Sequence, residues 1–415
     1  MSRRIGLGVA ICMLVLMAGL AMLPADGSAK TVYIGGTMSL TGPYAEDSAA
    51  VLAGFQDYVK YVNDTKQMAA WRKEKWPADI TVELLWRDDE LKPAKALSIY
   101  EELKAKGILV YRCSGSPVAL ALKDRLKQDG MGATSMSTGS FLMTPPGTIF
   151  TYYPIYTDDL AAVADWFKKN WKESRKPRVA YLTADNAMGK SIEIPEMEAY
   201  LKNEGYEFVG SQYVPLVPTS PPTTQLMWLK QNQVDLALGI MVNPGAQPTV
   251  KEMVRLGMGP NQAYKMVFAC GTPAHIVPFA DAMGELGDGF VVSGDYPPWE
   301  DSSPGIKWMV ELQKKYHPDK FVRHTQYMGG MVEAMTQLEA LRLAVEQTPL
   351  EKLKPADVLD NGFYKIKNLD MGGITSPITY GPGKIEGVDL VRVDQMEKGK
   401  IVSRGALPCR HVYKH

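Results

Sequence analysis

The chain has 415 residues, of which 46% are hydrophobic and 22% are charged, and this composition is that of a folded globular protein rather than a disordered one. Lysine plus arginine and aspartate plus glutamate balance at 46 each, which argues against a protein that binds nucleic acid or acidic membranes through excess positive charge. The length exceeds that of one ordinary core and predicts two domains.

The first 29 residues have the features of a signal peptide. Arg3 and Arg4 precede an uncharged apolar run over residues 5–23, and Gly-Ser-Ala at 27–29 places small residues at a cleavage site. Because the run is long enough to span a bilayer, an uncleaved anchor is the alternative interpretation. Cys12 lies inside the run, which argues against lipid attachment. We predict cleavage after residue 29 and a soluble mature chain in the periplasm.

The mature chain has few candidate metal ligands. It keeps Cys113, Cys270 and Cys409, and an odd number of cysteines cannot all pair within one chain. Cys113 and Cys270 each end a predicted strand, and we interpret them as buried free thiols. The histidines are scattered at positions 275, 317, 324, 411 and 415. No metal-binding spacing results, so we expect neither a metal nor a cofactor.

Short β-rich runs alternate with segments of helical periodicity, a pattern typical of parallel sheets covered by helices. The predicted strands span residues 31–38, 80–86, 108–113, 179–182, 207–213, 235–240, 266–270 and 289–292. The predicted helices span residues 48–64, 93–106, 116–128, 158–171, 191–203, 223–231, 245–256, 304–316 and 326–347. In the first of these helices, apolar residues from Val51 to Val62 form one stripe at helical spacing.

Three stretches depart from this alternation. Residues 65–78 predict an extended loop or an extra helix, and residues 215–222 contain four prolines, which favours a surface connection. The last fifty residues combine glycine-rich turns with alternating valine and leucine, and they predict an antiparallel β tail.

Four motifs follow one another in the order expected for a known family. They read SLTGPYAEDSAAVLAGFQDYVKYVND at 39–64, WRDDELKPAKAL at 86–97, RCSGSPVALALKD at 112–124 and VAYLTADNAMGKS at 179–191. Together they resemble the branched-chain amino-acid type of periplasmic binding protein, the leucine/isoleucine/valine-binding family. The resemblance extends over nearly the whole mature chain.

The resemblance implies two Rossmann-like α/β lobes with parallel sheets, joined by three hinge crossings in a Venus-flytrap arrangement. We expect one lobe to comprise residues 30–152 and about 293–376, and the other residues 153–292 and about 377–415. It also implies that a small molecule binds between the lobes and that closure presents a surface to the permease subunits of an ABC importer. A monomer is expected, without a nucleic-acid partner.

Three turns of the first lobe lie where a strand leads into a helix, at residues 40–44, 114–117 and 137–140. Free backbone N–H groups and the positive end of a helix suit a carboxylate there, although hydroxyl residues in such turns can also serve only as helix caps. The candidate ligand-binding residues of these turns are Tyr44, Ser114, Ser116, Ser137, Thr138 and Gly139. Among them, the serines, the threonine and the glycine are implied by the resemblance.

The second lobe departs from the amino-acid-binding pattern. Met188 stands where an aromatic residue is common, Asn243 follows the strand at 235–240, and Thr272 lies in a turn that offers an acidic residue to the ligand's ammonium in amino-acid binders. A buried ammonium without a counter-charge is costly, so an amino acid would require Asp47, Asp185 or Asp295. Tyr153 and Tyr296 follow the first and second crossings and complete the candidate site.

The favoured function is capture of a small polar or carboxylate-bearing metabolite for an ABC importer, with an amide or urea, an aromatic or aliphatic carboxylate, or an amino acid as ligand. A sensor domain that passes closure to a receptor partner is the alternative. A secreted hydrolase is disfavoured because the chain has no G-x-S-x-G or H-E-x-x-H motif. We therefore expect a binding protein and not an enzyme.

Overall fold

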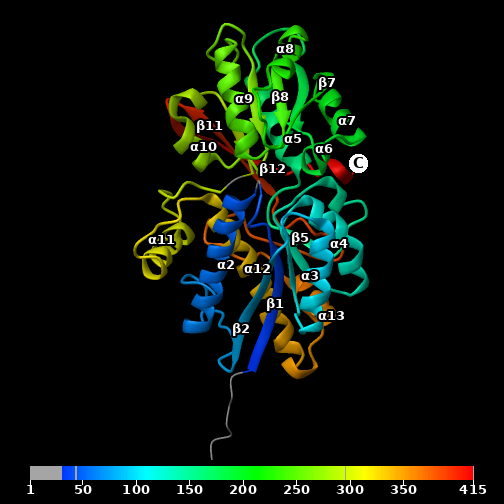
Figure 1. The fold of residues 1–415 in the computed structure, drawn as a ribbon, viewed down its shortest axis with the longest axis vertical. Helices are drawn as coiled ribbons and strands as arrows, with labels where there is room; N and C mark the ends of the chain where they lie inside the picture. The colour runs from blue at the N-terminus through cyan, green and yellow to red at the C-terminus, as the bar shows by residue number, and fades with distance from the viewer. Residues whose placement is uncertain (1–29, 43, 295, 415) are drawn as a thin grey trace, which may run out of the picture.

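The computed structural model describes residues 30–42, 44–294 and 296–414. The molecule is elongated and divided by a waist into two lobes, each built around one sheet (Figure 1). The predicted signal peptide lies outside the described residues. Among the described helices, none is long and apolar enough to cross a membrane.

The first lobe contains a parallel sheet of five strands in the order β2-β1-β3-β4-β5. Its strands are β1 (Lys30–Met38), β2 (Ile80–Asp88), β3 (Tyr111–Cys113), β4 (Ala133–Ser135) and β5 (Ile149–Thr151). The helices of this lobe are α2 (Ala45–Thr65), α3 (Pro93–Ala105), α4 (Ser116–Gln128), α11 (Pro304–Tyr316), α12 (Thr325–Gln347) and α13 (Pro355–Asn361). This order of strands brings the turns after β3 and β4 side by side at the carboxyl edge of the sheet.

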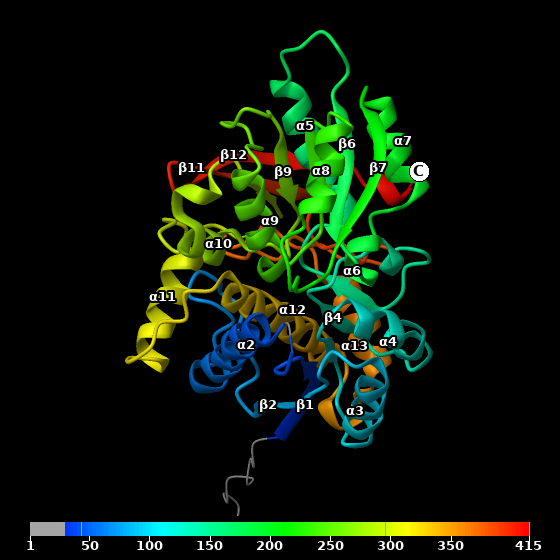
Figure 2. The same ribbon diagram turned by 45° about the horizontal axis from the view of Figure 1, so that its top comes forward.

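Helices α2 and α12 approach each other unusually closely, side by side in both ribbon views (Figure 2). A Cβ atom at Gly54 would lie 2.0 Å from the Tyr327 oxygen, and one at Gly330 would lie 2.0 Å from the Val51 oxygen. Only glycine therefore fits at these two crossing points. The close packing fixes the beginnings of both helices at the waist, where the binding site is expected.

The second lobe contains a sheet of seven strands in the order β12-β11-β10-β9-β8-β6-β7. Its parallel strands are β6 (Arg178–Ala184), β7 (Glu207–Val214), β8 (Leu236–Gly239), β9 (Val267–Cys270) and β10 (Val291–Ser293). The antiparallel strands β11 (Leu390–Glu397) and β12 (Lys400–Pro408) complete it and confirm the predicted β tail. Its helices are α5 (Tyr156–Asn170), α6 (Ala187–Lys190), α7 (Pro195–Asn203), α8 (Thr223–Gln231), α9 (Asn243–Arg255) and α10 (Ile276–Met283).

The chain passes between the lobes after β5, after β10 and before β11. The first and third crossings are tied together, because Thr151 pairs with Glu386 and Gly387 N–H donates to the Thr151 oxygen at 2.9 Å. The Glu386 carboxylate also accepts from the Ile155 N–H at 2.9 Å. The first and third crossings are thus joined to each other by hydrogen bonds at the hinge.

The sequence predictions agree with most elements, and helices 116–128, 223–231 and 304–316 are confirmed without any shift. The predictions missed β4 and β5, which have three residues each, and helices α10 and α13. The helix expected at 191–203 begins at Pro195, since proline fits the first helical turn. Residues 65–78 form a loop with an isolated bridge between Gln67 and Lys75 rather than a helix.

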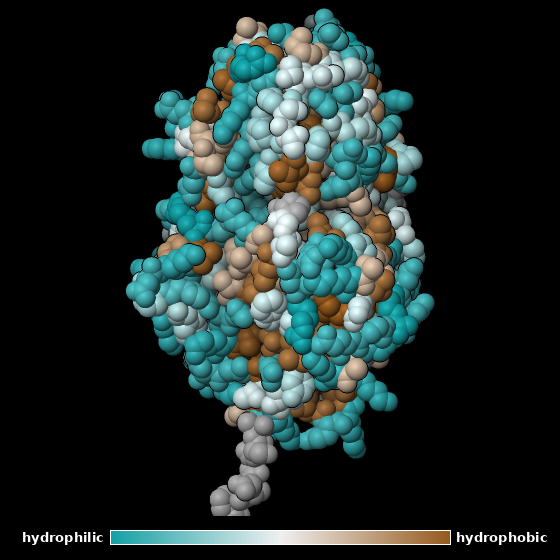
Figure 3. All heavy atoms as spheres, viewed as in Figure 1, coloured by the Kyte–Doolittle hydropathy of each residue, from teal (hydrophilic) through white to brown (hydrophobic). Residues whose placement is uncertain are grey.

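Hydrophilic residues cover most of the face seen in Figure 3, and the hydrophobic residues lie in small groups on both lobes and near the waist. The apolar side chains of the core lie inside the lobes, where they pack against both sheets.

Candidate ligand-binding site

A closed cleft lies between the lobes, at the carboxyl ends of the strands of both sheets. It encloses about 30 Å³, room for one or two water molecules. The lining residues are Tyr44, Asp47, Ser114, Gly115, Ser116, Met136, Ser137, Tyr153, Tyr156, Met188, Val242, Thr272, Pro273, His275 and Gln326. In this conformation the cleft must open before a metabolite can enter it.

The first-lobe wall is a cluster of serine hydroxyls. The Ser116 and Ser137 Oγ atoms lie 2.6 Å apart, and the Ser137 N–H donates to Ser135 Oγ at 2.9 Å. Ser114 donates its hydroxyl to the buried Asp89 carboxylate, which also accepts from Ser39 at 2.8 Å. Asp89 therefore fixes the orientation of the Ser114 hydroxyl and takes up its O–H, so that Ser114 can act toward a ligand only as an acceptor.

Helix α4 adds backbone donors to this wall. It begins at Ser116 after Gly115, whose backbone is extended, and no side chain caps its first turn. The first N–H groups of a helix have no partner within it and carry partial positive charge. Hydroxyls and helix N–H groups together suit an acceptor such as a carboxylate.

The second-lobe wall is largely apolar, with Met188, Val242 and Pro273 lining it. Thr272 is oriented by Asp159, to which it donates through its hydroxyl at 2.6 Å and its N–H at 3.2 Å. Burial raises the pKa of the Asp159 carboxyl well above its usual range, with the Thr272 hydrogen bonds acting in the opposite direction. Asp159 lies behind the wall and does not itself line the cleft.

Polar side chains from α2 and from the beginning of α12 form the third side. The Gln326 amide nitrogen donates to His275 Nε2 at 2.7 Å and to the Tyr153 hydroxyl at 3.3 Å, and its carbonyl oxygen is buried without a hydrogen-bond partner among the described residues. Asp47 lies 3.1 Å from His324 and is the acidic residue of the described lining. This side offers acceptor atoms to a donor group on a ligand.

Two contacts link the lobes directly across the rim of the cleft. The Tyr44 hydroxyl lies 3.3 Å from Met188 Sδ, and the Ser140 hydroxyl donates to the Ser191 oxygen at 2.5 Å. Both contacts join an N-terminal-lobe turn to the region of α6. They hold the closed conformation together at its mouth.

The structure brings many of the predicted residues together in this lining: Tyr44, Ser114, Ser116, Ser137, Tyr153, Met188 and Thr272. The remaining four do not line it. Thr138 is fully buried and accepts from the Tyr156 N–H, and Gly139 begins the short turn before Ser140. Asn243 donates to the His275 oxygen at 3.0 Å, which uses its side chain within the second lobe. Tyr296 lies in a separate hinge cavity.

An amino-acid ligand would need Asp47, Asp185 or Asp295 as the partner of its ammonium. Asp47 lines the cleft, whereas Asp185 is half-exposed and pairs with Lys190 at 2.6 Å. Asp295 lies outside the described residues. The lining residues Met136, Tyr156 and His275 were missed, because no local motif marks them. Cys113, Cys270 and Cys409 are buried and unbridged, and burial raises the pKa of the Cys113 thiol.

Comparisons with known proteins agree with this geometry. The profile of the family described as periplasmic binding protein matches residues 31–381. No curated protein matches the chain.

Solved structures share the fold at low identity. A branched-chain amino acid ABC transporter protein from Thermus thermophilus, with bound valine, has a TM-score of 0.80 at 19% identity, over 93% of this chain and 98% of that one. A fatty acid ABC transporter substrate-binding protein from Thermomonospora curvata has a TM-score of 0.75 at 19% identity, over 93% and 94%. A solute-binding protein from Rhodopseudomonas palustris, in complex with 3,4-dihydroxybenzoic acid, has a TM-score of 0.72 at 19% identity, over 91% and 98%.

The profile match extends from β1 to the turn that precedes the third crossing, and the two sheets joined by three crossings are those of the type I binding fold. The sequence resemblance is therefore confirmed, and the chain belongs to the periplasmic binding protein family.

Proposed function

We propose that this protein captures a small carboxylate-bearing metabolite in the interlobe cleft, outside the cytoplasm, and delivers it to the permease of an ABC importer. The observation that carries the proposal is the pair of hydroxyls on Ser116, at the beginning of α4, and Ser137, in the turn after β4, enclosed by the second lobe. Neither lysine nor arginine lines the described cleft, so neutral donors and the helix dipole would hold the anion.

The other walls favour an uncharged body on this ligand. Tyr44, Tyr153 and Tyr156 line the cleft with Met136 and Met188, and aromatic and thioether side chains pack well against a flat ring or a short aliphatic chain. Burial raises the pKa of Tyr156 to about 12, so its hydroxyl stays neutral near pH 7. We therefore favour an aromatic or short aliphatic carboxylate.

The acceptor side chains would bind a hydroxyl on such a ligand. The unpaired Gln326 carbonyl oxygen needs a donor, and Asp47 is engaged with His324. An α-amino acid is the second candidate, and it is favoured only by the presence of Asp47 in the lining. Solved relatives contain valine, 3,4-dihydroxybenzoic acid or 4-hydroxybenzoate, which all bear a carboxyl group.

Binding would proceed by hinge motion. The ligand meets the serine wall in the open state, and closure then adds Met188 and Thr272 together with the rim contacts of Tyr44 and Ser140. The ligand raises the population of the closed state only to the extent that it binds this state more tightly than the open state. The permease would recognise the closed form.

A calorimetric titration tests the ligand class. Valine, butanoate and 4-hydroxybenzoate are compared with 4-hydroxybenzamide, which keeps the ring and loses the charge. We expect 4-hydroxybenzoate to bind best, Ser137→Ala to weaken it by about 1–3 kcal/mol, and the exposed control Ser98→Ala to leave it unchanged. Preference for the amide, or equal affinity of Ser137→Ala and wild type, would refute the carboxylate assignment.

Uptake assays separate transport from sensing. Deletion of the gene should abolish import of the bound acid, whereas normal import with a lost transcriptional response would favour the sensor alternative. We also propose that the protein does not turn over its ligand, so that the bound acid is recovered unchanged after incubation. Accumulation of a product would overturn this part of the proposal.

A further inference from the structure

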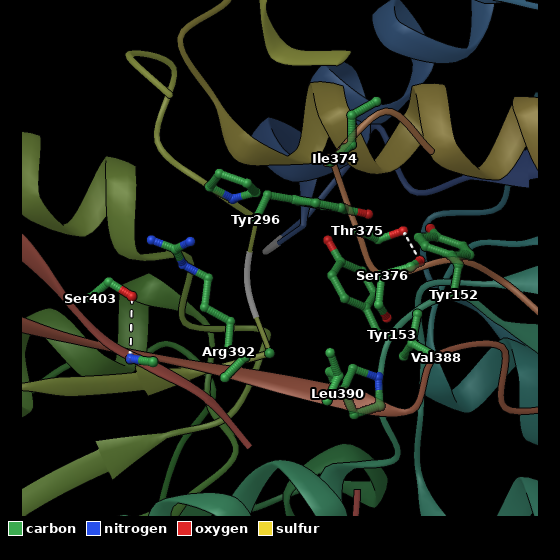
Figure 4. Close-up of a pocket in the computed structure, with 16 residues that line it drawn as sticks. Tyr152, Tyr153, Tyr296, Ile374, Thr375, Ser376, Val388, Leu390, Arg392 and Ser403 are labelled. Carbon is green, nitrogen blue, oxygen red and sulfur yellow. Dashed lines mark hydrogen bonds between the residues drawn. The ribbon is translucent and has the colours of Figure 1, made fainter. Parts of the chain in front are cut away.

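A second cavity, larger than the cleft, lies at the hinge. It encloses about 290 Å³. We call it the hinge cavity, and it is lined by residues of all three crossings, of a first-lobe loop, of the edge strand β12 and of its neighbour β11 (Figure 4). These residues are Tyr152, Tyr153, Pro154, Gly294, Tyr296, Pro297, Gly373, Ile374, Thr375, Ser376, Val388, Leu390, Arg392, Ser403, Gly405 and Ala406.

One aromatic side chain separates this cavity from the cleft. Tyr153 lines both, and its ring packs against Tyr152 and Tyr296, with centroids 5.1 and 5.0 Å away. Its hydroxyl accepts from Gln326, which lines the cleft. A change on one side of Tyr153 is therefore transmitted through direct contacts to the other side.

The polar groups of the hinge cavity are suited to an anion. Arg392 is the charged residue in its described lining, and its side chain is about one quarter exposed. Within the part of the chain that the structure describes, its guanidinium donates through Nε to Asp394 at 2.6 Å and makes no other side-chain hydrogen bond. The guanidinium therefore keeps its terminal nitrogens for another acceptor. Across the cavity, the Ser376 hydroxyl is buried without a hydrogen-bond partner among the described residues. A buried hydroxyl left unpaired is costly, and a polar group on a ligand would satisfy it.

The strand that carries Arg392 is locally irregular. The register of β11 and β12 shifts between Val393 and Asp394, and Gly405 opposite has a φ of +107°. Bulges of this kind redirect side chains and occur beside functional sites. The remaining lining, with Val388, Leu390 and Pro154, is apolar and would contact an uncharged body.

We propose that the hinge cavity is a second binding site, which takes a small organic carboxylate with an aromatic or short aliphatic body. The carboxylate contacts Arg392, and the body packs against Val388, Leu390 and the hinge tyrosines. Because Ser376 belongs to the first lobe and Arg392 to the second, an occupant that bridges them stabilises the closed conformation. Occupancy of the hinge cavity therefore raises the affinity of the cleft for its own ligand, and the reverse holds by linkage.

Crystals soaked with 4-bromobenzoate locate the site directly, because bromine scatters anomalously. We expect a bromine peak in the hinge cavity on the side of Val388 and Leu390, because the bromine is para to the carboxylate that contacts Arg392. A peak in the cleft alone overturns this inference and leaves the proposed function standing. A peak in the hinge cavity alone supports this inference and counts against an aromatic acid in the cleft. The absence of both peaks at millimolar probe refutes the inference.

Solution titration with 4-bromobenzoate uses the Ser116→Ala/Ser137→Ala variant, in which the cleft is weakened. In this background Arg392→Ala should reduce affinity about tenfold or more, as expected for a lost charge-assisted hydrogen bond. The matched control is Arg404→Ala, because Arg404 lies on β12 with similar exposure, pairs with Glu397 and does not line the cavity. Equal affinities of the Arg392 and Arg404 variants would refute the role of Arg392.

Coupling is measured as an interlobe distance. Leu120→Cys and Leu286→Cys place spin labels at exposed positions on the two lobes, and the three native cysteines of the described chain are buried. Addition of 4-bromobenzoate to the cleft-weakened variant should shift the distance distribution toward the closed form. An unchanged distribution, with the probe bound beside Arg392, would overturn the coupling.

Discussion

The two walls of the cleft hold their polar groups in opposite ways. In the first lobe, Arg112 lies behind the serines and is paired with Glu333 at 2.8 Å, and both side chains are fully buried. In the second lobe, the acid behind the wall is Asp159, which accepts hydrogen bonds only from Thr272 among the described residues. Behind the first wall lie a buried ion pair and the buried Asp89 carboxylate, which accepts from Ser39 and orients the Ser114 hydroxyl in advance. The second wall is a mostly apolar cover with the Asp159 carboxyl behind it.

This difference indicates a division of labour. A preorganised polar wall binds the charged end of a ligand with little reordering, and an apolar wall adds affinity when it closes. The second lobe also contains two adjacent carboxyl groups, Asp158 and Asp159, whose pKa values are raised by burial, so its stability should depend on pH. Four measurements test these contrasts.

The largest effect is expected for Glu333→Ala. Glu333 accepts from Arg112, from Thr134 at 2.7 Å and from Tyr152 at 3.1 Å. Its removal leaves the buried Arg112 guanidinium without its ion-pair partner, with the Thr37 backbone oxygen still accepting from Nη1 at 2.7 Å. We expect the free energy of unfolding to fall by about 3–5 kcal/mol in chemical denaturation. Glu102→Ala removes an exposed ion pair with Arg87 and should change little. Equal effects of the two variants would show that the first lobe does not depend on its buried pair.

The second prediction concerns pH. Burial, reinforced by the nearby Glu386 carboxyl, raises the pKa of Asp158 to about 8. A carboxyl whose pKa is raised on folding stabilises the folded state at low pH, and this stabilisation is lost as the pH rises from about 4 through about 8. Relative to Asp158→Asn, the wild-type free energy of unfolding should therefore fall over this range, by at most about 1.4 kcal/mol per pH unit. Parallel pH profiles would contradict the raised pKa.

The third prediction compares how much each wall of the cleft contributes to ligand affinity. Ser116→Ala removes a donor of the first-lobe wall and should weaken binding of the carboxylate by about 1–3 kcal/mol. Met188→Leu preserves volume on the second-lobe wall and should cost less than about 1.5 kcal/mol. Isothermal titration measures both values. A larger loss for Met188→Leu would reverse the proposed division of labour.

The smallest effect is expected at the rim. Tyr44→Phe removes the hydroxyl that contacts Met188 Sδ across the lobes, a weak contact because sulfur is a poor acceptor. We expect affinity to fall by no more than about 1 kcal/mol, through faster dissociation from a less stable closed state. Stopped-flow release of the ligand measures this rate. A slower association rate with unchanged dissociation would place Tyr44 in the first encounter instead.

The sequence determined the architecture because its signals are local. The lobes and most elements follow from the alternation of apolar runs and from prolines at first helical turns. The four sequence motifs also pointed to the serines of the first-lobe wall. Strands of three residues, such as β4 and β5, escaped because so short a run has no periodicity. They form because β3 offers an edge that extends the parallel sheet.

Only the tertiary structure decided which side chains meet. Gln326 and His275 are separated by 51 residues and Tyr44 and Met188 by 144, and each pair is joined by the packing of helices across the waist. Thr138 and Gly139 share a turn with Ser137, yet backbone direction sends only Ser137 into the cleft. Arg392 had no local signal at all, because its place in the hinge cavity depends on a bulge and on three crossings that the chain makes far apart in sequence.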